Sequence, residues 1–190
     1  MTRRRTTETD SFAGEFTEWI NAIPGPVDES VEAVRQRIGR ISRQFERVLA
    51  EVAEQRGLSV GDWEALSVLA RSSYEGDGLT PTRMANLLGL TSGTITVRID
   101  RLVRAGFVER AEGSDKRQHP IRLTRRGAEA WGEATLARTD AERELVHASL
   151  SNAEIVRLGE TLGKLLAQLE RVYGPAPRHD MTRTGGPKRA

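Results

Sequence analysis

Residues 80–106 read TPTRMANLLGLTSGTITVRIDRLVRAG, and this stretch decides the fold. Thr80-Pro81 predicts the start of a helix, because a threonine hydroxyl caps the first turn and proline fits the first helical position. Gly89 ends that helix, and Thr91 caps a second one. Two helices joined by a short turn around a glycine are typical of a helix-turn-helix, although other helical hairpins share this spacing.

Each of these two helices has one apolar face at helical spacing. The residues expected to point inward are Met84, Leu87 and Leu88 in the first helix, and Ile95, Ile99, Leu102 and Val103 in the second. Centring the second helix on Ile95 turns its polar residues and its small first residues outward. That face can approach another molecule closely.

The residues after the second helix predict a β-hairpin. Residues 107–112 and 119–124 read as two strands, and residues 113–117 form a charged turn between them. A helix-turn-helix followed by a hairpin is a winged helix, which we place at residues 59–127. The expected fold is therefore mainly α with a small β-hairpin wing.

Long helices flank the winged helix. We expect a short helix at residues 11–23, a long one at 27–56, and two more within 125–173. Apolar residues recur at alternating spacings of three and four in two of these helices, which is typical of helices that pack lengthwise on others. Two copies of the chain could bury these stripes against each other, so we predict N- and C-terminal dimerisation helices; a monomer with a six-helix core is the alternative. The stripes are Val31, Val34, Ile38, Ile41, Phe45, Val48 and Val52, and Ile155, Leu158, Leu162, Leu165, Leu169 and Val172.

Charge is unevenly distributed along the chain. The net charge is only +2, but residues 80–127 carry ten Arg or Lys against four Asp or Glu. Acidic residues outnumber basic ones on both sides of this segment, which indicates an anionic partner at one face of the protein. Residues 1–10 are expected to be disordered, and residues 174–190 to form a disordered basic tail.

Several classes of protein are excluded. There is no cysteine, which removes disulfides and thiol chemistry. No apolar run is long enough to span a membrane, and the arginines at positions 3–5 are not followed by the hydrophobic stretch of an export signal, so a cytoplasmic protein is expected. His119, His147 and His179 lie far apart, and no catalytic or phosphate-binding pattern occurs. We therefore expect no metal, no cofactor and no enzymatic activity.

The chain resembles the multiple-antibiotic-resistance regulator (MarR) family over about residues 30–172. The resemblance implies a homodimeric transcription regulator, usually a repressor, that binds double-stranded DNA and is released by small molecules. It rests on motifs whose order and spacing match: Leu79-Thr80-Pro81, Thr91-Ser92-Gly93-Thr94-Ile95-Thr96, Asp100-Arg101-Leu102, Gly106-Phe107-Val108-Glu109-Arg110, Asp115-Lys116-Arg117, Leu123-Thr124, Gly127 and Leu150-Ser151.

The DNA-binding candidates lie in two places. Free N–H groups and the helix dipole at the start of the second helix attract phosphate near Thr91 and Ser92, although both residues also suit ordinary capping. The resemblance places Thr94 and Thr96 near base edges. It also places an arginine of the wing tip in the minor groove. The alternative is that the wing tip is a solvated turn of mixed charge. The full set is Thr91, Ser92, Thr94, Thr96, Arg101, Asp115, Lys116 and Arg117, with Asp115 holding Arg117.

A second resemblance concerns small-molecule sensing. The chain is most similar to the urate-responsive branch of the family, which has an added N-terminal helix bearing a tryptophan. Matched by position, that branch's site corresponds to Trp19, Glu64, Arg98 and Arg110, with Glu64 in place of Asp. Two arginines against one carboxylate leave positive charge for an anionic or aromatic effector. Alternatively, Trp19 is a core residue and Glu64–Arg98 is a structural ion pair.

Three functions therefore remain. The first is a ligand-responsive repressor of transcription, and the second is a winged-helix DNA-binding protein that has no effector. The third is a protein-interaction adaptor or enzyme built on the same scaffold, against which the basic segment argues.

Overall fold

The computed structural model describes residues 10–72, 78–111 and 120–175. The chain divides into two compact units, the first extending to Arg47 and the second beginning at Val48. The boundary falls inside one long helix, α2 (Glu29–Glu54). The expected disorder of residues 1–10 and 174–190 falls almost entirely outside the described residues and stays a prediction. Among the helices that the structure describes, none is long and apolar enough to cross a membrane.

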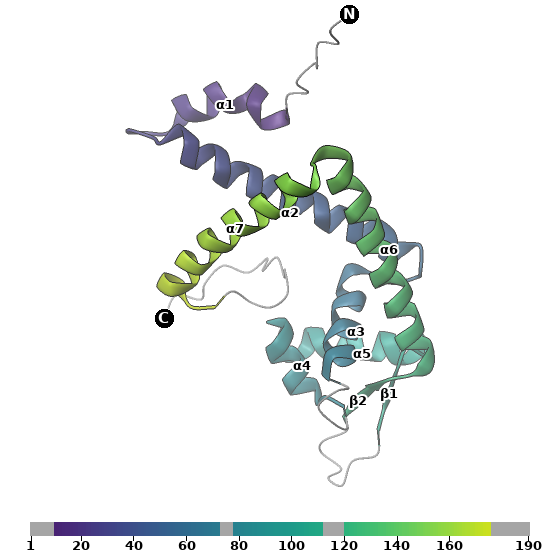
Figure 1. Cartoon of the computed structure of the whole chain (residues 1–190). Coiled ribbons are helices and arrows are strands. Elements are labelled where there is room, and N and C mark those ends of the chain that lie inside the picture. Colours follow the sequence, from purple (N-terminus) through teal and green to yellow (C-terminus); the bar gives the residue numbers. More distant parts are fainter. Residues whose placement is uncertain (1–9, 73–77, 112–119, 176–190) are drawn as a thin grey trace, which may run out of the picture. The chain divides into compact units, whose positions relative to one another are not determined.

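In the first unit, the short helix α1 (Ser11–Ala22) packs on the N-terminal part of α2 (Figure 1). Asp10 caps α1 with one carboxylate oxygen and accepts a hydrogen bond from Arg37 with the other, at 2.8 Å. The ring of Phe12 is buried, and the guanidinium groups of Arg37 and Arg40 lie 5.5 and 5.4 Å from its centre. Ion pairing and cation–π contacts therefore hold α1 in place around a single buried aromatic ring.

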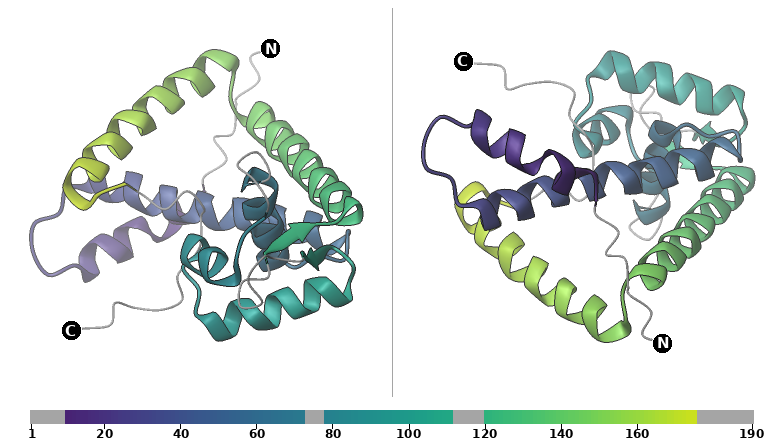
Figure 2. Two further views of the ribbon diagram at one scale, coloured as in Figure 1. Left: turned by 90° about the horizontal axis from the view of Figure 1, so that it is seen from below. Right: turned by 90° about the horizontal axis from the view of Figure 1, so that it is seen from above.

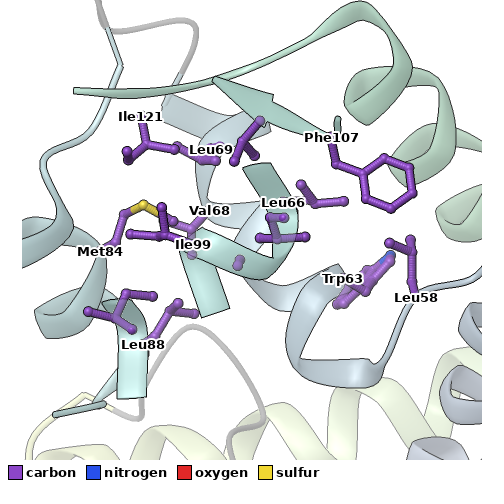
Figure 3. Packing of buried hydrophobic residues seen from close by; sticks show 14 of the residues in the cluster. Leu58, Trp63, Leu66, Val68, Leu69, Met84, Leu88, Ile99, Phe107 and Ile121 are labelled. Carbon is purple, nitrogen blue, oxygen red and sulfur yellow. The ribbon is translucent and has the colours of Figure 1, made fainter. Parts of the chain in front are cut away.

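The core of the second unit lies where three helices meet the hairpin. The helices are α3 (Val60–Ser72), α4 (Pro81–Leu88) and α5 (Ser92–Arg104). Figure 3 shows how their side chains interdigitate with those of the hairpin. The centre of this core contains Leu66, Met84, Ile99 and Ile121, none of which is measurably exposed.

The predicted helix-turn-helix is formed by α4 and α5. Thr80 caps α4, Pro81 occupies its first turn, and Gly89 ends it with φ at 62°, in the left-handed region that favours glycine. One prediction for the inner face is wrong, because Leu87 is 49% exposed and Ala85 is buried instead. The inward face of this eight-residue helix is shifted toward Ala85, so Leu87 lies at its exposed edge.

The wing is an antiparallel hairpin of β1 (Val108–Arg110) and β2 (Ile121–Leu123). Leu79, which precedes α4, exchanges two backbone hydrogen bonds with Ile121 at 3.1 and 2.8 Å, so the hairpin is tied to the helix-turn-helix. The strands are shorter than predicted within the described residues, and residues 112–119 lie outside them. Mainly helical structure with a small hairpin confirms the predicted winged-helix fold.

The helix α6 (Arg125–Ser149) starts against the hairpin and packs on α3 (Figure 1). Thr124 caps it by accepting the backbone N–H of Gly127 at 3.0 Å. Gly127 lies so close to the backbone of Phe107 that an added Cβ would be 2.8 Å from the carbonyl carbon of Phe107 and closer still to its oxygen. Farther along α6, Ala134 is fully buried.

The last helix, α7 (Asn152–Tyr173), forms a corner with α6 (Figure 2). Ser151 and Glu154 form a capping box at its start, exchanging backbone-to-side-chain hydrogen bonds of 2.9 and 3.4 Å. No residue of α7 is buried within the single chain, so this helix adds nothing to a monomeric core. The exposed apolar residues of the two predicted stripes are Val31, Val34, Ile38, Ile41 and Phe45 in α2, and Leu158, Leu162, Leu165, Leu169 and Val172 in α7.

Candidate nucleic-acid interface

The outer face of α5 is the centre of the candidate interface. As predicted, the inner stripe of Ile95, Ile99 and Leu102 is at most 1% exposed. This burial fixes which side of the helix faces solvent. The exposed residues at the start and along the outer face of α5 are Thr91, Ser92, Gly93, Thr94, Thr96, Val97, Asp100, Arg101 and Arg104.

Small side chains surround the start of α5. Thr91 Oγ1 accepts the backbone N–H of Thr94 at 3.2 Å, which confirms the capping interpretation of Thr91. Thr96 Oγ1 donates to the carbonyl oxygen of Ser92 at 2.8 Å, and no atom lies within 4 Å of a Cβ built on Gly93. These hydroxyls keep acceptor positions open to solvent. A phosphate or a base edge can therefore reach this end of the helix without displacing a bulky side chain.

Arg101 contacts α3, and the sequence did not predict this contact. Its Nη2 donates to Asp62 Oδ1 and lies 3.1 Å from Ser59 Oγ, although its side chain is 53% exposed. Asp62 is only 5% exposed, and together with Ser59 it forms a capping box at the start of α3. The capping box, which has Asp where Glu or Gln is usual, was the signal in the sequence that marks Asp62. The carboxylate of Asp62 also accepts a hydrogen bond from an arginine of another helix.

A second ion pair joins α5 to the wing. Arg110 of β1 donates from Nη2 to Asp100 Oδ1 at 2.7 Å, and both side chains are about half exposed. Arg104 donates from Nε to the carbonyl oxygen of Asp100 at 3.2 Å. Two neighbouring residues of α5, Asp100 and Arg101, are thus tied to two different elements, β1 and α3.

The predicted wing-tip residues Asp115, Lys116 and Arg117 lie outside the described residues, and their contact with DNA stays a prediction. The structure does describe two basic residues at the base of the wing. The side chain of Arg125 is 92% exposed, and the guanidinium of Arg126 lies 5.1 Å from the ring of the phenylalanine that precedes β1. Both belong to the basic segment of residues 80–127, but they were not among the predicted DNA-binding residues.

Of the four effector-site candidates, the structure brings two together. Arg98 Nη1 lies 3.7 Å from Glu64 Oε2, and the two side chains are only 17% and 10% exposed. The guanidinium of Arg98 covers Gly61 so closely that any side chain there would displace it. Arg98 Nη1 is buried and makes no hydrogen bond with the described residues, so this group retains donor capacity. Arg110 instead pairs with Asp100.

Trp19 belongs to the first unit and is 41% exposed, so it is not a core residue of the single chain. Its indole Nε1 donates to Glu32 Oε1 at 2.6 Å. Hydrogen bonds from Arg35, Gln36 and Trp19 lower the pKa of Glu32 to about 2. The indole is therefore held by a carboxylate that stays ionised well below neutral pH.

Among the described residues, no group of three or more His, Asp or Glu side chains could hold a metal ion.

Comparison with known proteins relates the chain to the MarR family. A model described as "MarR family" matches residues 56–118. The HTH-type transcriptional regulator PecS of Dickeya dadantii is 28% identical over 150 residues, which cover 78% of this chain and 88% of PecS. The HTH-type transcriptional repressor YetL of Bacillus subtilis is 36% identical over 88 residues, which cover 46% of this chain and 52% of YetL.

A solved structure of related fold is a MepR mutant of Staphylococcus aureus bound to an oligodeoxyribonucleotide. It superimposes with a TM-score of 0.56 at 24% identity and covers 72% of this chain and 97% of that one. At this identity the likeness shows the fold.

Proposed function

We propose that this chain is a homodimeric DNA-binding repressor of transcription. The family match and the two relatives by sequence support its membership of the MarR family, from which this proposal starts. The observation that carries the proposal is the exposed outer face of α5, with small and hydroxyl-bearing residues at its start. The relatives by sequence are named as a transcriptional regulator and a transcriptional repressor, which supports regulation rather than catalysis.

We assign the outer face of α5 to the major groove. Thr94 and Thr96 are exposed near the helix start, and their hydroxyls can donate to or accept from base edges. The net charge of +6 on residues 80–127 matches a polyanion. The MepR mutant of similar fold was solved with an oligodeoxyribonucleotide, which agrees with this assignment.

Homodimerisation is supported by the apolar stripes of α2 and α7. Ten of their residues, five in each helix, remain between 36% and 63% exposed within the single chain. Exposed stripes of this length are uncommon on monomers and mark interaction surfaces. A twofold dimer would also place two recognition helices in successive major grooves of a pseudo-palindromic site.

The wing would add contacts in the flanking minor groove. In this proposal Arg117 inserts there, Asp115 orients it and Lys116 lies beside the phosphates. The narrow, negative minor groove of A·T-rich DNA favours an inserted arginine.

The effector site is proposed around Arg98 and Arg110, as in the urate-responsive branch. Each arginine pairs with a carboxylate, Glu64 or Asp100, and Arg98 Nη1 retains a donor. A small anionic or aromatic effector would compete for these guanidinium groups. Because Arg98 and Asp100 belong to α5, such competition would disturb the DNA-binding helix itself.

The alternative is a winged-helix DNA-binding protein without an effector. The observation that favours it is the closeness of Arg98 to Glu64, at 3.7 Å and with both side chains largely buried. In that case the pair is structural, and the amount of protein alone controls occupancy of the DNA.

The DNA-binding proposal is tested by selecting duplexes from a random-sequence pool with the full-length protein. We expect a pseudo-palindrome whose half-sites lie about 10 base pairs apart, and a dimer in sedimentation. Thr96→Ala should weaken binding about fivefold per half-site. The matched control is Thr139→Ala in α6, because Thr139 donates the same kind of hydrogen bond to the carbonyl four residues earlier. Equal affinities of the two variants would exclude Thr96 from the interface.

The effector proposal is tested with urate and benzoate as probes. Both should release the selected duplex from the wild type and not from Arg98→Ala, provided that the variant is a folded dimer with measurable affinity. Arg125→Ala is the control, since Arg125 also pairs with a carboxylate but lies in the open. If neither probe shifts the thermal midpoint or releases DNA, the effector-independent alternative is favoured.

A further inference from the structure

We propose that Asp62 and Arg101 form a positioning pair for α5, so that a buried acidic residue of α3 is required for DNA binding. The inference rests on the proposed DNA-binding function and deepens it. It reassigns Arg101, which the sequence pattern had placed among the DNA contacts, to a role that acts through the helix that carries it.

The geometry of Asp62 divides its two oxygens between two tasks. Oδ2 accepts the backbone N–H of Ser59 at 3.0 Å and the Ser59 hydroxyl at 2.7 Å, which caps α3. Oδ1 accepts from Arg101 Nη2, and that nitrogen is also 3.1 Å from Ser59 Oγ. The carboxylate is nearly inaccessible to water, so these partners satisfy it.

Only a carboxylate can perform both tasks at this position. An ionised Asp presents acceptors on both oxygens, whereas Asn presents one acceptor and one donor. In Asp62→Asn, either the Ser59 N–H or the Arg101 guanidinium would face the amide NH₂. The variant therefore loses the link to α5 or the cap of α3, without a change in side-chain volume.

The pair supplies a directional contact that the apolar packing of α5 lacks. Ile95, Ile99 and Leu102 set how deeply the helix sits, but apolar burial is non-directional. Hydrogen bonds weaken steeply with misalignment, so the bond from Arg101 resists rotation and sliding of α5 on α3. The direction in which Thr94 and Thr96 project toward the DNA depends on that alignment.

The competing role for Arg101 is a direct phosphate contact, since its side chain is about half exposed. The two roles predict opposite changes in DNA affinity for the same substitution, Asp62→Asn. Asp62→Asn removes a negative charge from the basic segment's surroundings, which by electrostatics alone strengthens DNA binding. The positioning role predicts weaker binding.

The experiment measures the affinity of the full-length protein for a duplex selected by the wild type, at several salt concentrations. The variants are Asp62→Asn, Arg101→Gln and the double variant, each studied at a temperature where circular dichroism shows it folded. We expect each single variant to bind about tenfold more weakly or worse, with an unchanged salt slope. The double variant should be no weaker than the weaker single, because both remove the same link.

Ser59→Ala is the matched control, because it weakens the cap of α3 but leaves the ion pair. It should lower the melting temperature with only a small loss of DNA affinity. A loss as large as that of Asp62→Asn would reduce the effect to the stability of α3 and overturn the proposal.

Two other results would overturn it. One is an affinity of Asp62→Asn equal to or above wild type. The other concerns the slope of log affinity against log salt concentration for Arg101→Gln. If its magnitude falls by about two, each subunit has lost one phosphate contact. If Asp62→Asn does not fold, the DNA affinity of Arg101→Gln and its salt slope decide between the two roles. This variant leaves both hydrogen bonds from Ser59 to the buried carboxylate in place.

A readout without DNA separates this inference from the proposed function. Hydrogen exchange of the α5 amides in the free protein should be faster in Arg101→Gln than in wild type. Unchanged exchange would contradict the positioning role even if the wild type selects no duplex, whereas failure to select a duplex contradicts the proposed function itself.

Discussion

Replacing Gly127 with alanine tests the close approach between α6 and the start of the wing. In an ordinary helix interior this substitution stabilises by about 1 kcal/mol, because alanine has the higher helix propensity. At Gly127 the added Cβ would lie 2.8 Å from the carbonyl carbon of Phe107, closer than the 3.0 Å that real Cβ contacts respect. The obstructing atoms belong to backbone, so no side chain can rotate away.

The expected size of the effect follows from three contributions. Overpacking of this kind costs about 1–3 kcal/mol. The carbonyl of Phe107 also accepts the backbone N–H of Thr124 at 3.1 Å, and loss of that bond adds about 1 kcal/mol. After subtracting the propensity gain, we expect Gly127→Ala to lower the free energy of unfolding by about 2 kcal/mol.

The matched control is Gly132→Ala in the same helix, where no atom lies within 4 Å of an added Cβ. This variant should raise the free energy of unfolding by about 0.5–1 kcal/mol. Urea denaturation followed by circular dichroism, at equal protein concentrations, measures both effects. If the two variants shift the midpoint in the same direction by similar amounts, the argument from the Phe107 backbone is refuted.

Three further predictions concern the dimer, the wing and pH. Leu165→Glu should place an unpaired carboxylate in each half of the proposed interface and give monomers in sedimentation velocity; a well-folded dimer would contradict that interface. Arg117→Ala should weaken the free energy of DNA binding by about 1–3 kcal/mol per side on operators with A·T-rich flanks, and Asp115→Ala should have a smaller effect. If binding titrations show that the Arg117 variant matches wild type on both A·T and G·C flanks, the wing has only a structural role. Hydrogen bonds, that of a neighbouring arginine foremost, lower the pKa of Glu32 from 4.5 to about 2, so its contribution to stability is complete above about pH 4.5 and is lost as the pH falls through about 2. The NMR signal of the Trp19 indole N–H should report this loss, and a transition already complete near pH 4 would disprove it.

Helix boundaries were predictable because their signals are local. Thr80, Gly89 and Thr91 each act within three or four residues of their own position, and all three have the predicted role in the structure. The exposed Leu87 was mispredicted because α4 has only eight residues. Two turns of helix are too short for periodicity to fix the centre of the buried face.

The ionic links around α5 could not be predicted. Arg101 and Asp62 are 39 residues apart, and no local pattern says that an exposed arginine on one helix reaches the cap of another. The pairing of Asp100 with Arg110 likewise depends on where β1 lies beside α5. The sequence identified Arg101 as important, but its partner became visible only in three dimensions.

The unburied face of α7 has a consequence for the life of a newly made chain. If the chain pairs with a second copy as proposed, then before pairing it displays the kind of apolar surface that chaperones bind and proteases remove. On the proposed pairing, assembly rises with the square of the chain concentration, whereas clearance of single chains rises only in proportion to it. Halving the synthesis rate would therefore more than halve the amount of assembled protein, so that cells in a population would differ more in this protein than in its messenger RNA.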